Sequence, residues 1–79
     1  DMENTTPICI GKMSDTNYMF IVNGMQRVAK VGDRVQIKYE KNKNIMKARG
    51  CLTSVNLDEM MIGNRTFAMH SVRDFISLP

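Results

Sequence analysis

The chain has 79 residues, of which 43% are hydrophobic and 24% are charged, and its formal net charge is +3. A chain of this length holds one hydrophobic core, and this balance of residues is typical of a folded domain. No run approaches the roughly 20 apolar residues that cross a bilayer, and the N-terminus lacks the pattern of a signal peptide. We therefore expect a soluble cytoplasmic domain that makes no membrane contact.

Residues 1–6 are expected to form a flexible N-terminal tail, and residues 7–79 a single domain. Asp1 before Met2 is typical of a cloning remnant ahead of a native start codon, which predicts a complete small gene product. Cys9 and Cys51 form no CxxC motif. Because thiols stay reduced in the cytoplasm, both cysteines are interpreted as small buried hydrophobic residues.

Short runs rich in Val, Ile, Met, Tyr and Phe recur between turn residues at intervals of roughly 8 to 12, which predicts a small β-sandwich or barrel. The first run covers residues 7–13. The second covers residues 18–22 and resumes over residues 25–29 after Asn23-Gly24, a strong hairpin signal.

The central segment predicts a long, bent hairpin. Residues 34–40 alternate strictly between apolar and polar side chains, so that Val35, Ile37 and Tyr39 face the core. A polar loop over residues 41–44 follows, and the chain returns over residues 45–55. Because the alternation slips beyond Gly50, we expect a β-bulge there.

The C-terminal part predicts a second tight hairpin and a closing strand. Residues 60–62 are expected to pair with residues 65–69 across Gly63-Asn64, with one helical turn over residues 57–61 as the competing interpretation. Residues 71–74 fit a turn of 3₁₀ helix. A last strand over residues 75–78 completes an antiparallel barrel of five or six strands.

This order of elements, from Gly32-Asp33 through the bent hairpin, the tight hairpin, the helical turn and the last strand, resembles the SH3-like small barrels, including Sm-like and KOW-type domains. The resemblance covers about residues 31–78 and implies an all-β barrel that hosts unrelated functions. The chain departs from the Sm-like pattern, because it lacks an amphipathic helix before the first strand and an Asp-x-x-x-Asn motif after the bulge. The alternative is an OB-type barrel, with the Asn23-Gly24 hairpin in the main sheet.

Residues that carry catalysis or bind metals are sparse. His70 is the only histidine, and no metal-binding motif accompanies it, so it is interpreted as structural. Asp58-Glu59 lies in a predicted turn, where adjacent side chains diverge. The eight methionines are interpreted as filling an irregular core, with an adaptable binding surface as the alternative. Met60 and Met61 are adjacent, so on a strand one of them must face away from the core. We expect no enzyme activity, cofactor or metal site.

Charge is the most informative feature. Residues 27–49 hold eight basic residues against two acidic ones, a formal charge of +6, while the remainder carries −3. Strand alternation places the basic residues of the hairpin on its outward face, with two lysines at its tip. The predicted nucleic-acid-binding residues are Arg34, Gln36, Lys38, Lys41, Lys43, Lys47 and Arg49.

These residues predict a small nucleic-acid-binding module, for RNA before DNA, with a regulatory or inhibitory role. The sequence predicts no row of outward aromatic side chains for base stacking, and only Tyr18 and Phe20 are candidates for an exposed position. Recognition is therefore expected to rely on the phosphate backbone. The alternative is a protein-binding module that inhibits or adapts a larger enzyme or regulator, through the basic hairpin or an unpaired sheet edge. A solvated hairpin that resists aggregation and an edge-to-edge homo-oligomer are further interpretations.

Overall fold

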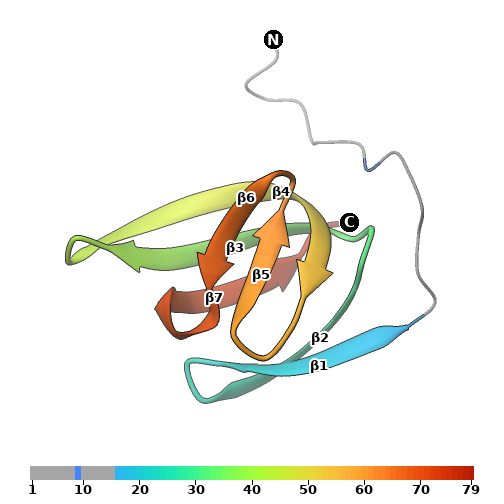
Figure 1. The fold of residues 1–79 in the computed structure, drawn as a ribbon, viewed down its shortest axis with the longest axis horizontal. Coiled ribbons are helices and arrows are strands. Elements are labelled where there is room, and N and C mark those ends of the chain that lie inside the picture. Colours follow the sequence, from blue (N-terminus) through green and yellow to red (C-terminus); the bar gives the residue numbers. More distant parts are fainter. Residues whose placement is uncertain (1–8, 10–15) are drawn as a thin grey trace, which may run out of the picture.

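The computed structural model describes Cys9 and residues 16–79, which form an all-β fold with one turn of 3₁₀ helix (Figure 1). The elements in chain order are β1 (Asn17–Val22), β2 (Met25–Lys30), β3 (Arg34–Lys41), β4 (Asn44–Val55), β5 (Glu59–Ile62), β6 (Arg65–Ala68), η2 (Met69–Ser71) and β7 (Val72–Ser77). The predicted tail over residues 1–6 and the predicted first run over residues 7–13 lie outside the described residues, apart from Cys9.

Two antiparallel sheets make up the described part of the chain. β1 and β2 form a two-stranded sheet, and the second sheet has the order β6-β5-β4-β3-β7. The all-β prediction is confirmed, whereas the seven described strands exceed the predicted five or six and their ladders do not close into one barrel. The β1–β2 hairpin is separate from the main sheet, unlike in the OB-type alternative, and the SH3-like resemblance stays a prediction.

Two-residue turns close the hairpins. Asn23 and Gly24 have φ angles of 50° and 80° between the paired residues Val22 and Met25, as the Asn-Gly sequence predicts. The turn between β3 and β4 is tighter than the predicted loop over residues 41–44, because only Asn42 and Lys43 lie outside the ladder. The hairpin across Gly63-Asn64 is confirmed, with Ile62 opposite Arg65.

The core lies between the two sheets and contains no buried polar side chain among the described residues. Strict alternation in β3 buries Val35, Ile37 and Tyr39, as predicted. These three pack with apolar side chains from the other six strands: Phe20, Val22, Ala29, Ala48, Leu52, Met60, Ile62, Phe67, Val72 and Phe75. The rings of Tyr39 and Phe67 are tilted by 60° with their centroids 4.8 Å apart, and this contact links β3 to β6.

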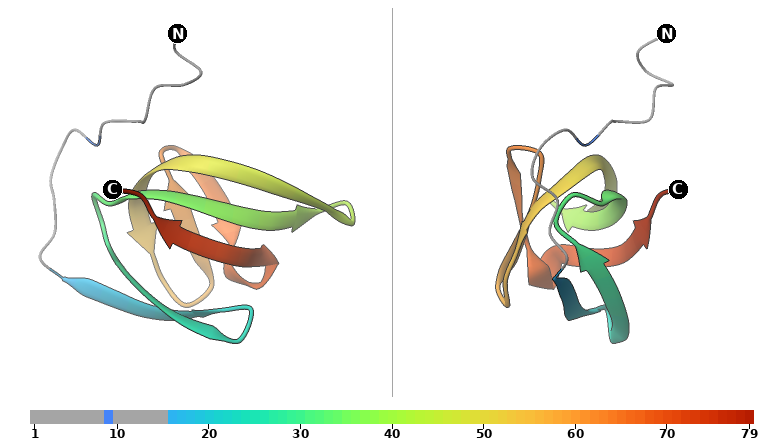
Figure 2. Two further views of the ribbon diagram at one scale, coloured as in Figure 1. Left: turned by 180° about the vertical axis from the view of Figure 1, so that it is seen from behind. Right: turned by 90° about the vertical axis from the view of Figure 1, so that its right-hand side faces the viewer.

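The β1–β2 sheet is held against β7, and the two lie close together in the views of Figure 2. The rings of Phe20 and Phe75 meet edge to face at 4.9 Å. Arg27 Nε donates a hydrogen bond of 3.2 Å to the Phe75 carbonyl, and its guanidinium lies 3.9 Å from the Asp74 carboxylate. Contacts from the core and from the surface therefore fix the small sheet on the large one.

β4 is shared between two partners and bends between them. Its first part, up to Cys51, pairs with β3, and its last part pairs with β5. The predicted bulge at Gly50 is wrong, because Gly50 pairs in register with Val35 and the register shift falls between Leu52 and Ser54. Gly50 instead leaves space for a neighbour, since a Cβ atom there would lie 2.8 Å from Ile62 Cγ2.

The helical predictions for the C-terminal part are partly correct. The competing helical turn over residues 57–61 is wrong, because β5 begins at Glu59. The 3₁₀ turn exists but covers Met69–Ser71, two residues earlier than predicted, because Ser71 Oγ donates to the Ala68 carbonyl at 2.7 Å rather than capping a later turn. The last strand, Val72–Ser77, is correspondingly longer than predicted.

The two cysteines are bonded to each other. Cys9 and Cys51 form a disulfide with their Cα atoms 5.4 Å apart, so the prediction of two reduced, buried thiols is wrong. The absence of a CxxC motif excluded one kind of cysteine pair but carried no information on residues brought together across 42 positions. The expectation of a cytoplasmic location loses its support from reduced thiols, because disulfides persist chiefly in oxidising compartments.

Gly50→Ala is expected to lower the free energy of unfolding by about 1 to 3 kcal/mol, because the new methyl group overlaps Ile62 Cγ2 in a packed core. Chemical denaturation measures this cost. In an Ile62→Ala background the overlap is absent, so the cost of Gly50→Ala should fall by about 1 kcal/mol or more. Equal costs in the two backgrounds would show that Ile62 is not the residue that requires glycine here.

Reduction of the Cys9–Cys51 disulfide is expected to lower the free energy of unfolding by about 2 to 4 kcal/mol, because the bond closes a long loop. Thermal unfolding with and without dithiothreitol measures the change. A thiol assay on the unfolded, unreduced protein should detect no free thiol. Two free thiols per chain in that assay would contradict the pairing.

Candidate nucleic-acid interface

The outward face of the β3–β4 hairpin carries a cluster of basic side chains. Cross-strand pairing puts Gln36 opposite Arg49 and Lys38 opposite Lys47, so that these four lie on one side of the sheet. Arg34 shares this face in β3, one pair further along. The structure thus gathers the predicted residues into a basic face of Arg34, Gln36, Lys38, Lys47 and Arg49, with Lys41 and Lys43 at its tip.

Lys38 and Lys47 form a like-charge pair. Their Cα atoms are direct partners in the ladder, and neither ammonium group takes part in an ion pair within the described residues. Asp74 is the β7 neighbour of Lys38, but its carboxylate accepts from the Phe75 amide at 2.9 Å and lies 3.9 Å from Arg27. Like charges directly opposite each other are destabilising in a sheet.

The acidic residue nearest the tip is also engaged elsewhere. The Glu40 carboxylate lies 3.3 Å from the Arg73 guanidinium, in an ion pair that joins β3 to β7. The two acidic groups beside the basic face are therefore directed toward arginines outside it. The lysines of the face remain available to an external anion.

The tip presents a lysine in an unusual conformation. Lys43 has a φ of 66°, in the left-handed region where a turn normally carries glycine or asparagine. A non-glycine residue there costs roughly 1 kcal/mol. Lys41, Lys43 and Lys47 are all exposed, and the hairpin projects beyond the body of the molecule (Figure 1). The lysine ammonium groups at the tip are therefore far from the body of the molecule and exposed to solvent.

The two arginines of the basic face are oriented by hydrogen bonds. Arg49 Nε and Nη2 both lie within hydrogen-bonding distance of Gln36 Oε1, at 3.2 and 2.7 Å. Arg34 donates to the Pro79 carbonyl. Neither guanidinium is in an ion pair within the described part of the chain, so each retains its charge for a ligand.

Aromatic side chains contribute no stacking surface here. None of the five aromatic residues is exposed: Phe20, Tyr39, Phe67 and Phe75 are buried, and Tyr18 is half-buried. The Arg65 guanidinium, which could stack on a base, instead covers the Phe67 ring at 4.9 Å. A ligand on the basic face is therefore held by charge and hydrogen bonds rather than by stacked bases.

Other reactive groups do not form a site. His70 is exposed in η2, Asp58 is exposed in the turn before β5, and Glu59 is exposed as the first residue of β5. No group of three or more His, Cys, Asp or Glu residues among Cys9 and residues 16–79 is arranged to hold a metal ion.

Some neighbours of the face could not be identified from the sequence. Ile76 lies beside Gln36, and Asp74 beside Lys38, because β7 pairs with β3. Ile45 and Met46 are exposed near the tip, although Met46 is paired with the buried Tyr39.

No protein-family model, no curated protein and no solved structure matches the chain. No helix in the described residues is long and apolar enough to span a membrane.

Lys47→Glu is expected to raise the free energy of unfolding by about 0.2 to 1 kcal/mol, because it converts the like-charge pair with Lys38 into an attractive pair. Lys47→Gln, which removes the repulsion alone, should give an intermediate value. Thermal unfolding at low salt measures both, and high salt should reduce the difference. A loss of stability in Lys47→Glu would contradict the like-charge pair as described.

Proposed function

We propose that this domain binds the phosphate backbone of a nucleic acid through the basic face of the β3–β4 hairpin. The observation that carries the proposal is the pair of Lys38 and Lys47, which are opposed in the ladder and take part in no ion pair within the described residues. Such an arrangement costs stability in the free protein and favours a bound polyanion, which neutralises both charges.

The arrangement of polar groups supports backbone contact over base reading. Lysines and arginines neutralise phosphates, and the Gln36 amide with Asn42 and Asn44 at the tip supplies further hydrogen-bonding groups. The absence of exposed aromatic side chains in the described residues argues against strong sequence preference on single strands. We propose RNA before DNA as the partner, in a regulatory or inhibitory role.

The triple variant Lys38→Glu, Lys47→Glu and Arg49→Glu is expected to abolish binding to labelled single-stranded RNA and DNA without unfolding the domain. Fluorescence anisotropy measures the affinity. The logarithm of the wild-type affinity should fall linearly with the logarithm of salt concentration, at about −0.7 for each phosphate neutralised on a single strand. The triple variant should lose most of this slope.

Charge-matched control variants distinguish binding at the basic face from a general effect of the net charge on affinity. Lys30→Glu in β2 changes the net charge as much as Lys47→Glu but lies outside the hairpin, so it should weaken binding far less. Polyglutamate, as a stand-in for an acidic protein surface, should compete poorly with RNA. Equal losses in the two single variants, or no measurable affinity for RNA or DNA at about 50 mM salt, would refute the proposed function.

A further inference from the structure

A second surface of the molecule contains an unprotected sheet edge. β1 pairs only with β2 in the described structure, so one of its edges is free. Its sequence, NYMFIV, has no charged residue and no proline. The other outer strands, β2, β6 and β7, all carry charged residues, as free edges usually do to prevent strand addition. β1 is therefore the outer strand that is open to a further strand.

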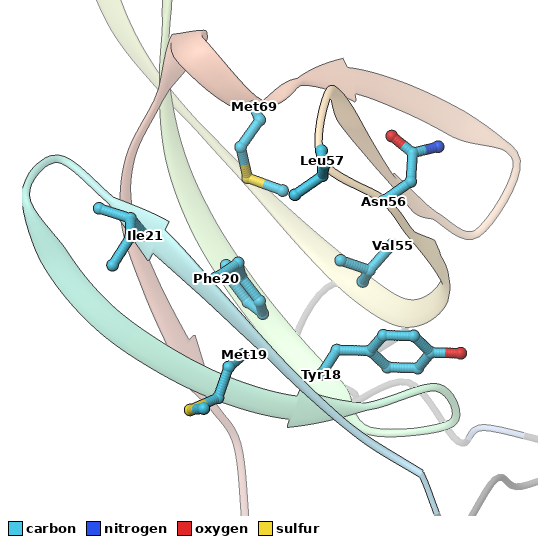
Figure 3. A pocket seen from close by; sticks show the side chains of 8 residues that line it. All are labelled: Tyr18, Met19, Phe20, Ile21, Val55, Asn56, Leu57 and Met69. Atoms are coloured by element: carbon cyan, nitrogen blue, oxygen red, sulfur yellow. The ribbon is translucent and has the colours of Figure 1, made fainter.

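A groove of about 470 Å³ runs along this edge (Figure 3). Four consecutive β1 residues, Tyr18 to Ile21, line one wall, and Val55, Leu57 and Met69 belong to the facing wall. Successive strand residues point to opposite faces, so four in a row around one cavity place it along the strand edge rather than over one face. The main chain of β1 is thus part of the groove.

The pairing of β1 leaves hydrogen-bonding groups directed at the groove. In an antiparallel hairpin, residues alternate between those that exchange hydrogen bonds with the partner and those whose main-chain groups point away. Because the two-residue turn closes at the pair of Val22 and Met25, this alternation assigns Met19 and Ile21 to the outward-pointing set. An extended peptide satisfies such groups by adding to the sheet.

The facing wall is held rigidly. Asn56 Oδ1 accepts from the amides of Asp58 and Glu59 at 2.8 and 2.9 Å, and the Met69 amide donates to the Asp58 carbonyl at 2.7 Å. This fixed turn presents Leu57, a residue that is 94% exposed. An exposed leucine on an ordered turn, across the groove from the free edge of β1, offers apolar area to a ligand.

Charge at the rim indicates the chemistry of the occupant. Asp58 and Glu59 are exposed next to Leu57, and neither takes part in an ion pair among the described residues. A second copy of this chain that paired through its own β1 would add a strand that itself carries no cation, and its β2 would come behind that strand. A separate extended segment with a basic residue fits the walls and the charge better.

We propose that this groove binds an extended segment of a partner protein, which adds to β1 as a strand. Its apolar side chains at alternate positions enter the groove between Phe20, Val55 and Met69, and a Lys or Arg at one end faces Asp58 and Glu59. The methionines suit side chains of varied shape, since their thioethers are flexible. The groove is formed by β1, the β4–β5 turn and η2, whereas the basic face belongs to the β3–β4 hairpin, so both can be occupied together.

The test uses the full chain and a phage-displayed library of random linear peptides of about ten residues, the length of a long strand. Enriched peptides should show alternating apolar residues with Lys or Arg toward one end. N-methylation of the peptide backbone at alternate residues should weaken binding about tenfold or more, because each blocked amide leaves a ladder hydrogen bond unmade. N-methylation at the intervening residues should leave affinity unchanged.

Matched variants of the protein locate the binding edge. Met19→Lys places a charge on the free edge and should abolish peptide binding. Val28 is the cross-strand partner of Met19 and lies on the same outer face, but on β2, away from the free edge. Val28→Lys should therefore leave the peptide affinity unchanged. Leu57→Glu changes a side chain without core contacts and should weaken binding about tenfold. Met19→Lys should also leave nucleic-acid affinity intact, which separates this proposal from the proposed function.

Three outcomes of the peptide experiments would overturn the proposal. These are no enriched peptide, equal effects of Met19→Lys and Val28→Lys, and peptides that tolerate N-methylation at every position. A concentration-dependent dimer in sedimentation, dissolved by Met19→Lys, would also overturn it, because a second copy would then occupy the edge.

Discussion

The strict alternation of apolar and polar side chains in β3, which lies between β4 and β7, sets the register of the main sheet. Val35, Ile37 and Tyr39 are buried, and each inward side chain forces its polar neighbour outward. The hydrophobic core and the basic face are therefore two consequences of one pattern. A register slip of one residue would expose Ile37 and bury Lys38. The free-energy cost of burying an unpaired lysine charge rules out such a slip.

The basic face and the apolar groove each present side chains that gain from a ligand. Lys38 opposes Lys47, so a bound anion would relieve their repulsion. Leu57 is almost fully exposed, so a ligand that covers it would bury apolar area. With both surfaces occupied as proposed, the domain would join a nucleic acid to a partner protein. This arrangement unites the two binding modes that the sequence left as alternatives.

Local rules of the sequence predicted much of the architecture. Asn23-Gly24 specified its turn, and the alternation of β3 specified which side chains form the basic face. Features that depend on contacts between distant segments were missed. Gly50 does not form a bulge but leaves space for the Ile62 side chain. Cys51 forms a disulfide with Cys9, 42 positions away in the sequence.

The groove could not be predicted for the same reason. Its walls come from β1, the turn after β4 and η2, which are far apart in the sequence. The alternation in β1 could have indicated that Met19 and Ile21 face away from Phe20, but not that one edge of the strand stays unpaired. Of the six described methionines, Met60 is buried and Met69 packs against the core, whereas Met19, Met25 and Met46 are exposed, so core filling accounts for only some of them.

Binding at the basic face can be mapped by the amide chemical shifts of the ¹⁵N-labelled chain during titration with a single-stranded RNA of about ten nucleotides. At about 50 mM salt, where electrostatic binding is favoured, we expect saturable shifts confined to β3, β4 and the turn at Asn42-Lys43. The amides of β1 and of the turn at Leu57 should stay unchanged. Shifts concentrated at β1, or no shifts at any RNA concentration, would contradict binding at the basic face.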